Sequence, residues 1–254
     1  MGFFDLLNPA FDAVDGFLAG FAAQPVRLIF WAFVGSLVTM LLYQRLSRQD
    51  QMGQLKGELR QAQRALSNFD GEFDELRPLI ARTLGLSMKQ LGLSLGPAVL
   101  ASLPLIFLLA WAATRFAANA PDPGDPVQVT LQPPTAEAHW SPPTAAEMLD
   151  PGVWRVDWPG PGETLELSSG DEELVSLPTP QPTPIVHKKQ WWNALFANPG
   201  GYLPPEAPLK AVEIGLPSAS YLPFGPDWVR SWLTAFLLAL FAFSLLLKIV
   251  LKIH

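Results

Sequence analysis

Residues 94–116, SLGPAVLASLPLIFLLAWAATRF, form an apolar run long enough to cross a bilayer, although Pro97 and Pro104 interrupt it. A helix of about 20 apolar residues spans the roughly 30 Å of hydrocarbon in a membrane. Two further runs share this character, VRLIFWAFVGSLVTMLLY at 26–43 and VRSWLTAFLLALFAFSLLLKIVL at 229–251. The sequence therefore predicts an α-helical integral membrane protein whose three transmembrane helices, the last with a basic tail, lie at 26–43, 95–117 and 228–254.

The two prolines in the second run lack the N–H that an interior helical position needs. We expect Pro97 in the first turn of its helix, where the missing N–H costs little. Pro104 then interrupts the helical hydrogen bonds and predicts a kink in the second span, at which a neighbouring helix or water satisfies the freed carbonyl.

The composition agrees with a membrane protein, since 49% of the residues are hydrophobic, 16% are charged and the mean hydropathy is +0.22.

The first apolar run lacks a basic region before it and a small-residue cleavage site after it. We interpret it as an uncleaved span and not as a signal peptide. The chain has no cysteine, which excludes disulfides and cysteine-ligated metals.

The basic residues predict the orientation, because cytoplasmic loops are enriched in Lys and Arg. Residues 44–94 hold eight Lys and Arg, whereas the longer stretch 118–227 holds four, against fourteen Asp and Glu. We expect an exoplasmic N-terminus and a cytoplasmic C-terminus in the inner membrane of a bacterium. Arg27 and Arg115, near the ends of spans, are expected to extend to the aqueous phase. The net charge of −6 is mostly exoplasmic and gives no indication of a nucleic-acid partner.

Residues 1–25 predict an amphipathic helix at the outer membrane interface. Between residues 3 and 21 apolar side chains recur every three or four positions, opposite Asp5, Asp12 and Asp15. Packing of the apolar face against the protein's own exoplasmic domain is the alternative.

Residues 44–94 predict a cytoplasmic coiled coil, because apolar residues recur there at alternating steps of three and four. A turn-like stretch at 67–71 favours a helical hairpin, since both ends must return to the same membrane face, and one bent helix is the alternative. The residues of this heptad stripe are Met52, Leu55, Leu59, Ala62, Leu66, Phe69, Phe73, Leu76 and Ile80.

Residues 118–227 predict a small exoplasmic all-β domain, because four short runs alternate apolar and polar residues between prolines and glycines. These runs are VQVTL at 127–131, WRVDW at 154–158, TLELSS at 164–169 and AVEIGL at 211–216. The proline-rich segment 177–186 is expected to cross the surface as extended chain. The aromatic content, five tryptophans between 140 and 192, argues against a disordered linker.

Within this region, HKKQWWNALFANPGGYLPP at 187–205 predicts a short surface helix with Trp191, Trp192, Leu195 and Phe196 on one face. Such a face suits the headgroup zone of a membrane or a docking surface for a partner protein. The three histidines lack the spacing of metal ligands, and no catalytic or phosphate-binding motif stands out. We expect neither an enzyme nor a bound metal or cofactor.

Together, the stretches YQRLSRQDQMGQLKGELRQAQRAL, MKQLGLSLGPAVLASLPLIFLLAWAATRF and GPDWVRSWLTAFLLALFAFSLLLKIVLKIH resemble the YidC/Oxa/Alb superfamily. The resemblance is closer to its minimal three-span branch, which includes archaeal and bacterial YidC-like proteins and the third subunit of the endoplasmic-reticulum membrane protein complex. It covers residues 1–117 and 221–254. The chain departs from the family by lacking an arginine in the middle of the first span and by its long exoplasmic insertion.

The resemblance implies a membrane-protein insertase or chaperone, with a hydrophilic groove open to the cytoplasm and a mobile hairpin that contacts clients or the ribosome. A non-catalytic accessory subunit of a larger membrane complex is the alternative, binding through the exoplasmic domain and the helices. Polar candidates for the groove are Ser36, Thr39, Ser102 and Ser244. Candidates for client or partner binding are Leu55, Leu59, Leu66, Phe69, Phe73, Trp191, Trp192 and Phe196.

Overall fold

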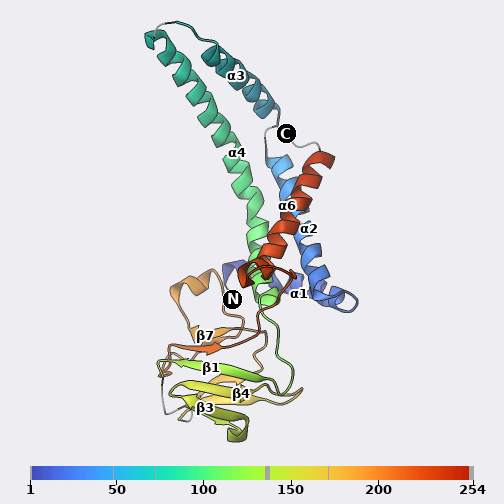
Figure 1. The fold of residues 1–254 in the computed structure, drawn as a ribbon, viewed down its shortest axis with the longest axis vertical. Helices are drawn as coiled ribbons and strands as arrows, with labels where there is room; N and C mark the ends of the chain where they lie inside the picture. The colour runs from blue at the N-terminus through green and yellow to red at the C-terminus, as the bar shows by residue number, and fades with distance from the viewer. Residues whose placement is uncertain (1, 48, 72, 135–137, 171, 252–254) are drawn as a thin grey trace. The chain divides into compact units, whose positions relative to one another are not determined.

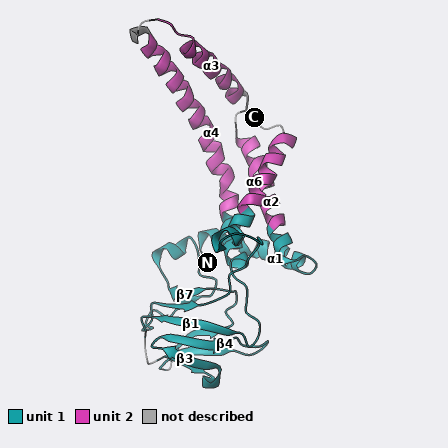
Figure 2. Ribbon diagram, viewed as in Figure 1, with its two compact units in different colours: residues 1–28, 107–236 teal, residues 29–106, 237–254 magenta. Residues whose placement is uncertain are grey.

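The computed structural model combines long helices with two β-sheets (Figure 1). The chain divides into two compact units (Figure 2). Unit 1 comprises residues 1–28 and 107–236, and unit 2 comprises residues 29–106 and 237–254. The structure describes residues 2–47, 49–71, 73–134, 138–170 and 172–251.

Three helices are long and apolar enough to cross a membrane, as the sequence predicts. They are α2 (Gln24–Leu46), the part of α4 (Phe73–Phe116) from Leu76 onward, and α6 (Trp232–Val250). α4 has 44 residues, which at about 1.5 Å per residue is about twice the thickness of the hydrocarbon layer. A bilayer of this thickness can enclose only part of this helix.

The structure corrects the expectation for Pro97. α4 begins at Phe73 and runs through Pro78, Pro97 and Pro104, so Pro97 lies deep inside the helix and not in its first turn. The leucines at 91, 93 and 95 and the leucine- and alanine-rich stretch after Pro97 favour the helix on both sides of the missing N–H. The kink at Pro104 stays a prediction.

The basic segment forms a helical hairpin within unit 2. α3 (Gln49–Ser67) and α4 are separated by a short turn, and Figure 1 shows α3 alongside the first half of α4. The Ser94 hydroxyl of α4 donates to the Gln90 carbonyl of its own helix at 2.9 Å, and its oxygen lies 3.7 Å from the Met52 sulfur of α3, so the two helices are in contact there. From the heptad stripe, Met52, Leu55 and Ala62 are buried. The interdigitated side-chain packing of a coiled coil stays a prediction.

The β domain contains nine described strands in two sheets. The six-stranded sheet has the order β3-β4-β1-β9-β7-β8, and the three-stranded sheet has the order β2-β5-β6. The four predicted strands are confirmed as β1 (Pro126–Gln132), β4 (Val153–Asp157), β5 (Leu165–Ser169) and β9 (Ala211–Ile214). The other strands are β2 (Ala138–Ser141), β3 (Ala146–Asp150), β6 (Glu172–Leu177), β7 (Ile185–Lys188) and β8 (Tyr202–Leu203).

One apolar core joins the two sheets. β1 pairs antiparallel with β4 and β9, and Val129 at its centre is fully buried. Leu167 of β5 is also fully buried in this core, together with Trp140 of β2. Sheets that bury one face each against the other stabilise a β domain without disulfides.

The proline-rich segment 177–186 differs from its prediction. Instead of only crossing the surface, it buries Thr179 and Thr183. Both hydroxyls donate to the backbone carbonyl of Gln181, at 2.6 and 2.9 Å, which lets these polar side chains enter the domain.

Short helices complete the described fold. They are η1 (Phe3–Asp5), α1 (Asn8–Ala19), η2 (Pro143–Ala145), η3 (Trp191–Ala194) and α5 (Asp227–Arg230).

Replacing Leu167 with alanine should lower the free energy of unfolding of the β domain by about 2–5 kcal/mol, because the substitution leaves a cavity in a tightly packed core. The control is Glu166→Ala, the exposed neighbour on the same strand, which should change stability by less than about 0.5 kcal/mol. Denaturant unfolding followed by tryptophan fluorescence measures both. Equal stabilities of the two variants would contradict this description of the core.

Candidate functional site

Two of the polar candidates in the spans meet inside unit 2. The hydroxyl oxygens of Ser36 in α2 and Ser244 in α6 are 2.9 Å apart, and Ser36 is only 1% exposed. The rings of Phe33 and Phe243 pack beside them, 5.3 Å apart. This hydrogen bond joins the first and third spans through polar groups in otherwise apolar surroundings.

Thr39 lies about one turn from Ser36 on the same helix. Its hydroxyl oxygen is buried and has no hydrogen-bond partner among the described residues. Ser102 behaves differently, because its hydroxyl donates to the backbone carbonyl of Val99, 2.8 Å away in its own helix. Ser102 is therefore satisfied locally, as serines in apolar helices commonly are.

A cavity of about 470 Å³ lies beside the last turns of α2. Its described lining consists of Leu41, Gln44 and Arg45, which share one helical face because they are spaced by three and four residues. Ser36, Thr39, Gln44 and Arg45 thus provide polar groups along the half of α2 that ends at this cavity.

The predicted client-binding residues of the hairpin differ in accessibility. Leu55 is buried within the hairpin, so it stabilises the α3–α4 contact and is not free to bind a client. Leu59, Leu66 and Phe69 are half-buried, and the Phe73 side chain lies outside the described part of the structure.

A different apolar stripe on α4 is exposed. Its members are spaced by three or four residues and so share one helical face. Sequence reasoning assigned Ile80 to the heptad and did not single out the rest, although their spacing was visible. The stripe consists of Ile80, Leu84, Met88, Leu91 and Leu95.

In unit 1 the acidic residues of α1 bind residues at the end of α4. Asp12 accepts hydrogen bonds from the indole N–H of Trp111 at 2.7 Å and from the guanidinium of Arg115 at 2.7–2.9 Å. Both carboxylate oxygens bind the guanidinium, which is the strong bidentate arrangement. Sequence reasoning missed this site, because 103 residues separate its two charges.

A second ion pair joins Asp15 of α1 to Arg27 of α2. The Arg27 guanidinium also lies 5.9 Å from the centre of the Phe116 ring. The backbone carbonyl of Phe116 accepts a 3.0 Å hydrogen bond from the Tyr221 hydroxyl. Burial raises the pKa of Tyr221 above its usual value, and the nearby Arg27 opposes this, so the hydroxyl stays protonated and able to donate. Arg27 and Arg115 are therefore paired with carboxylates instead of extending freely into water.

These pairs decide which face of α1 is exposed. Asp15 is buried, whereas Phe17 is 74% and Phe21 70% exposed. The β domain therefore does not cover Phe17 and Phe21, whereas Phe4, nearer the N-terminus, stacks on Phe196 of that domain at 4.8 Å. An exposed phenylalanine face directly before a membrane span fits the bilayer interface.

The tryptophan segment forms a tighter structure than predicted. Its helix is the single 3₁₀ turn η3, because the side chain of Asn193 binds the backbone on both sides of it. The Asn193 carboxamide accepts from the N–H of Gln190 at 2.7 Å and donates to the carbonyl of Phe196 at 3.0 Å. Trp191 is 85% exposed, and Trp192 and Phe196 are also exposed.

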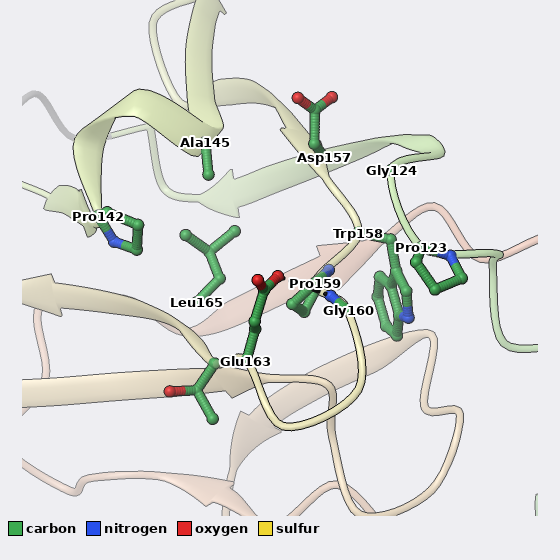
Figure 3. Close-up of a pocket in the computed structure, with 11 residues that line it drawn as sticks. Pro123, Gly124, Pro142, Ala145, Asp157, Trp158, Pro159, Gly160, Glu163 and Leu165 are labelled. Carbon is green, nitrogen blue, oxygen red and sulfur yellow. Dashed lines mark hydrogen bonds between the residues drawn. The ribbon is translucent and has the colours of Figure 1, made fainter.

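The β domain has a pocket of about 510 Å³ (Figure 3). Prolines, Trp158 and Leu165 make most of its wall. Two carboxylates, Asp157 and Glu163, also line it, and Glu163 accepts a 3.0 Å hydrogen bond from the N–H of Gly160 and so closes a turn. The described residues contain no group of three His, Asp or Glu that could hold a metal ion.

Comparison of the chain with protein-family models, with curated proteins and with solved structures finds no match in any of the three.

Replacing Asp12 with alanine should lower the free energy of unfolding by about 1–3 kcal/mol, because the partly buried Arg115 loses its carboxylate. Glu206→Ala, which removes an exposed acid, is the control and should have little effect. Unfolding in detergent micelles measures both variants. A double-mutant cycle with Arg115→Met should show that the two losses are not additive, and additive losses would contradict a direct interaction.

Proposed function

We propose that the protein is a membrane-protein insertase of the YidC/Oxa type, which helps hydrophobic segments enter the bilayer without using nucleotide. The observation that carries this proposal is the open arrangement of the spans. Only 28%, 11% and 6% of their apolar windows are buried within the protein. Such large apolar surfaces require lipid or another hydrophobic segment to cover them.

Polar groups along α2 support the same function. A client that crosses the bilayer must bring a polar flank past the hydrocarbon, where unsatisfied polar groups cost several kcal/mol each. Thr39 has an unpartnered hydroxyl, and Gln44 and Arg45 line a cavity at the end of the helix. The Ser36–Ser244 pair would offer further hydrogen-bonding partners if it opened.

The hairpin supports capture of the client before insertion. Its exposed stripe on α4 presents Ile80, Leu84 and Met88 on a helix that extends beyond the bilayer. In the orientation that the Lys and Arg distribution favours, the N-terminus and the β domain are exoplasmic and the hairpin and C-terminus are cytoplasmic. A hairpin on that side of a bacterial inner membrane can receive chains from the ribosome.

A second candidate is an accessory subunit of a larger membrane complex. The exposed Trp191 and Trp192 favour it, since exposed tryptophans are common anchors in protein interfaces. In such a complex, the exposed apolar surfaces of the three spans would contact other subunits.

Purified protein in liposomes should increase the membrane insertion of a client with a short translocated tail, compared with empty liposomes. Protease protection of the tail measures insertion. The double variant Ser36→Ala with Ser244→Ala should reduce the inserted fraction severalfold, because it removes the polar pair between the first and third spans.

Ser87→Ala is the matched control, since the Ser87 hydroxyl only donates to the carbonyl of Thr83 in its own helix. This variant should insert the client as the unchanged protein does. If the unchanged protein inserts no more client than empty liposomes, the insertase proposal is wrong. Recovery of a stable membrane complex in mild detergent would then favour the accessory subunit.

A further inference from the structure

The tryptophan segment 187–196 of the β domain contains an exposed apolar surface. Trp191 has the most exposed of the large apolar side chains, and Leu195 and Phe196 are exposed beside it. The turn is rigid, because the Asn193 side chain binds the backbone on both sides of it and the Trp192 ring packs 5.1 Å from that of His187. An indole held in water by a rigid turn indicates a surface made for contact.

The N-terminal segment connects this turn to α4. The ring of Phe4 stacks on Phe196 at 4.8 Å and meets Phe107 of α4 edge-on at 5.1 Å. The N–H of Phe4 donates to the carbonyl of Leu195 at 2.9 Å. At Gly2 a Cβ would lie 2.5 Å from that same carbonyl oxygen, so the close approach requires glycine.

Two further hydrogen bonds hold the N-terminal segment against the tryptophan segment. The carboxylate of Asp5 accepts the N–H of Ala197 and the N–H of Gly2, both at 2.8 Å. Since Asp5 is itself buried, these bonds lie in a low-dielectric environment, where they hold the end of the tryptophan segment more strongly against the N-terminus.

The connection to α4 sets the level of the turn relative to the bilayer. The Asp12–Arg115 ion pair indicates that this end of α4 lies at the interface, because charged groups are costly in the hydrocarbon, and the buried Trp111 donates its indole N–H to the same carboxylate. Phe107 lies one helical turn, about 5.4 Å, further into the apolar run. Phe4 contacts Phe107, and Phe196 stacks on Phe4. This chain of contacts brings the tryptophan turn to the edge of the hydrocarbon.

Charge also favours lipid as the partner. The region 118–227 holds only four Lys and Arg, and two of them, Lys188 and Lys189, directly precede the tryptophan turn. Lys189 is exposed. Cations beside interfacial aromatic residues attract the phosphates of lipid headgroups, whereas the rest of this acidic domain would be repelled by an anionic membrane.

We propose that residues 187–196 anchor the β domain to the bilayer, with Trp191 inserted among the lipid headgroups beside the end of α4. This contact goes beyond insertase activity and does not depend on it. The competing explanation is that a partner protein covers this turn. Residue 191 would then lie against protein and be shielded from both lipid and water.

The experiment uses the natural absence of cysteine, so a single introduced cysteine can carry a fluorescent label. Trp191→Cys and the control Leu149→Cys are labelled with an environment-sensitive dye in full-length protein, in liposomes of phosphatidylethanolamine and phosphatidylglycerol. Leu149 is an exposed apolar residue of β3. Nitroxide attached to lipid and iodide in the water serve as quenchers.

The label at position 191 should emit at shorter wavelength and be quenched severalfold more by the lipid nitroxide than the label at position 149. The label at 149 should be quenched by iodide. Iodide quenching at 191 equal to that at 149 overturns the proposal. Protection of 191 from both quenchers also overturns it, because a protein contact then covers the turn.

Discussion

The carboxylate of Asp12 accepts hydrogen bonds from both Trp111 and Arg115, and the organisation of unit 1 depends on it. The Trp111 indole N–H and the Arg115 guanidinium at the end of α4 are polar groups in a largely apolar helix, and the Asp12 carboxylate of α1 satisfies both. Once they do, α1 lies against α4 with its acidic side inward. The Asp15–Arg27 pair repeats this arrangement at the start of α2. Val14 and Phe17, on the other side of α1, are consequently exposed, which in a membrane protein directs them to lipid.

The β domain and the spans are stabilised in different ways. The β domain buries a common core between its sheets, as a soluble domain does. The spans bury little of their apolar surface within the protein, and a polar Ser36–Ser244 bond is among the contacts between them. Since lipid tails are as apolar as leucine, there is little hydrophobic force to close such spans on one another. An open set of helices with internal polar groups is what a scaffold for passing hydrophobic segments requires.

Length and hydropathy were enough to predict the three spans, and alternation was enough for β1, β4, β5 and β9. The alternation of apolar and polar residues did not reveal β3, because four of its five residues are exposed, or β8, because it has only two residues. The start of α4 was misplaced because Pro97 looked like a helix beginning, although the preceding leucines continue the helix. The candidate site was harder to predict, because the pairing of Asp12 with Arg115 depends on tertiary structure. An acid opposite an apolar helical face was its only signal in the sequence.

The orientation of α1 is the central claim of this account, and nitroxide labels along the helix in a lipid bilayer test it directly. Single cysteines at Val14 and Phe17, on the exposed face, are compared with cysteines at Phe11 and Leu18, which are less exposed. The structure predicts high accessibility to oxygen, which dissolves in lipid, at 14 and 17, and low accessibility to both oxygen and a water-soluble nickel complex at 11 and 18. High accessibility to the nickel complex at 14 and 17 would contradict it.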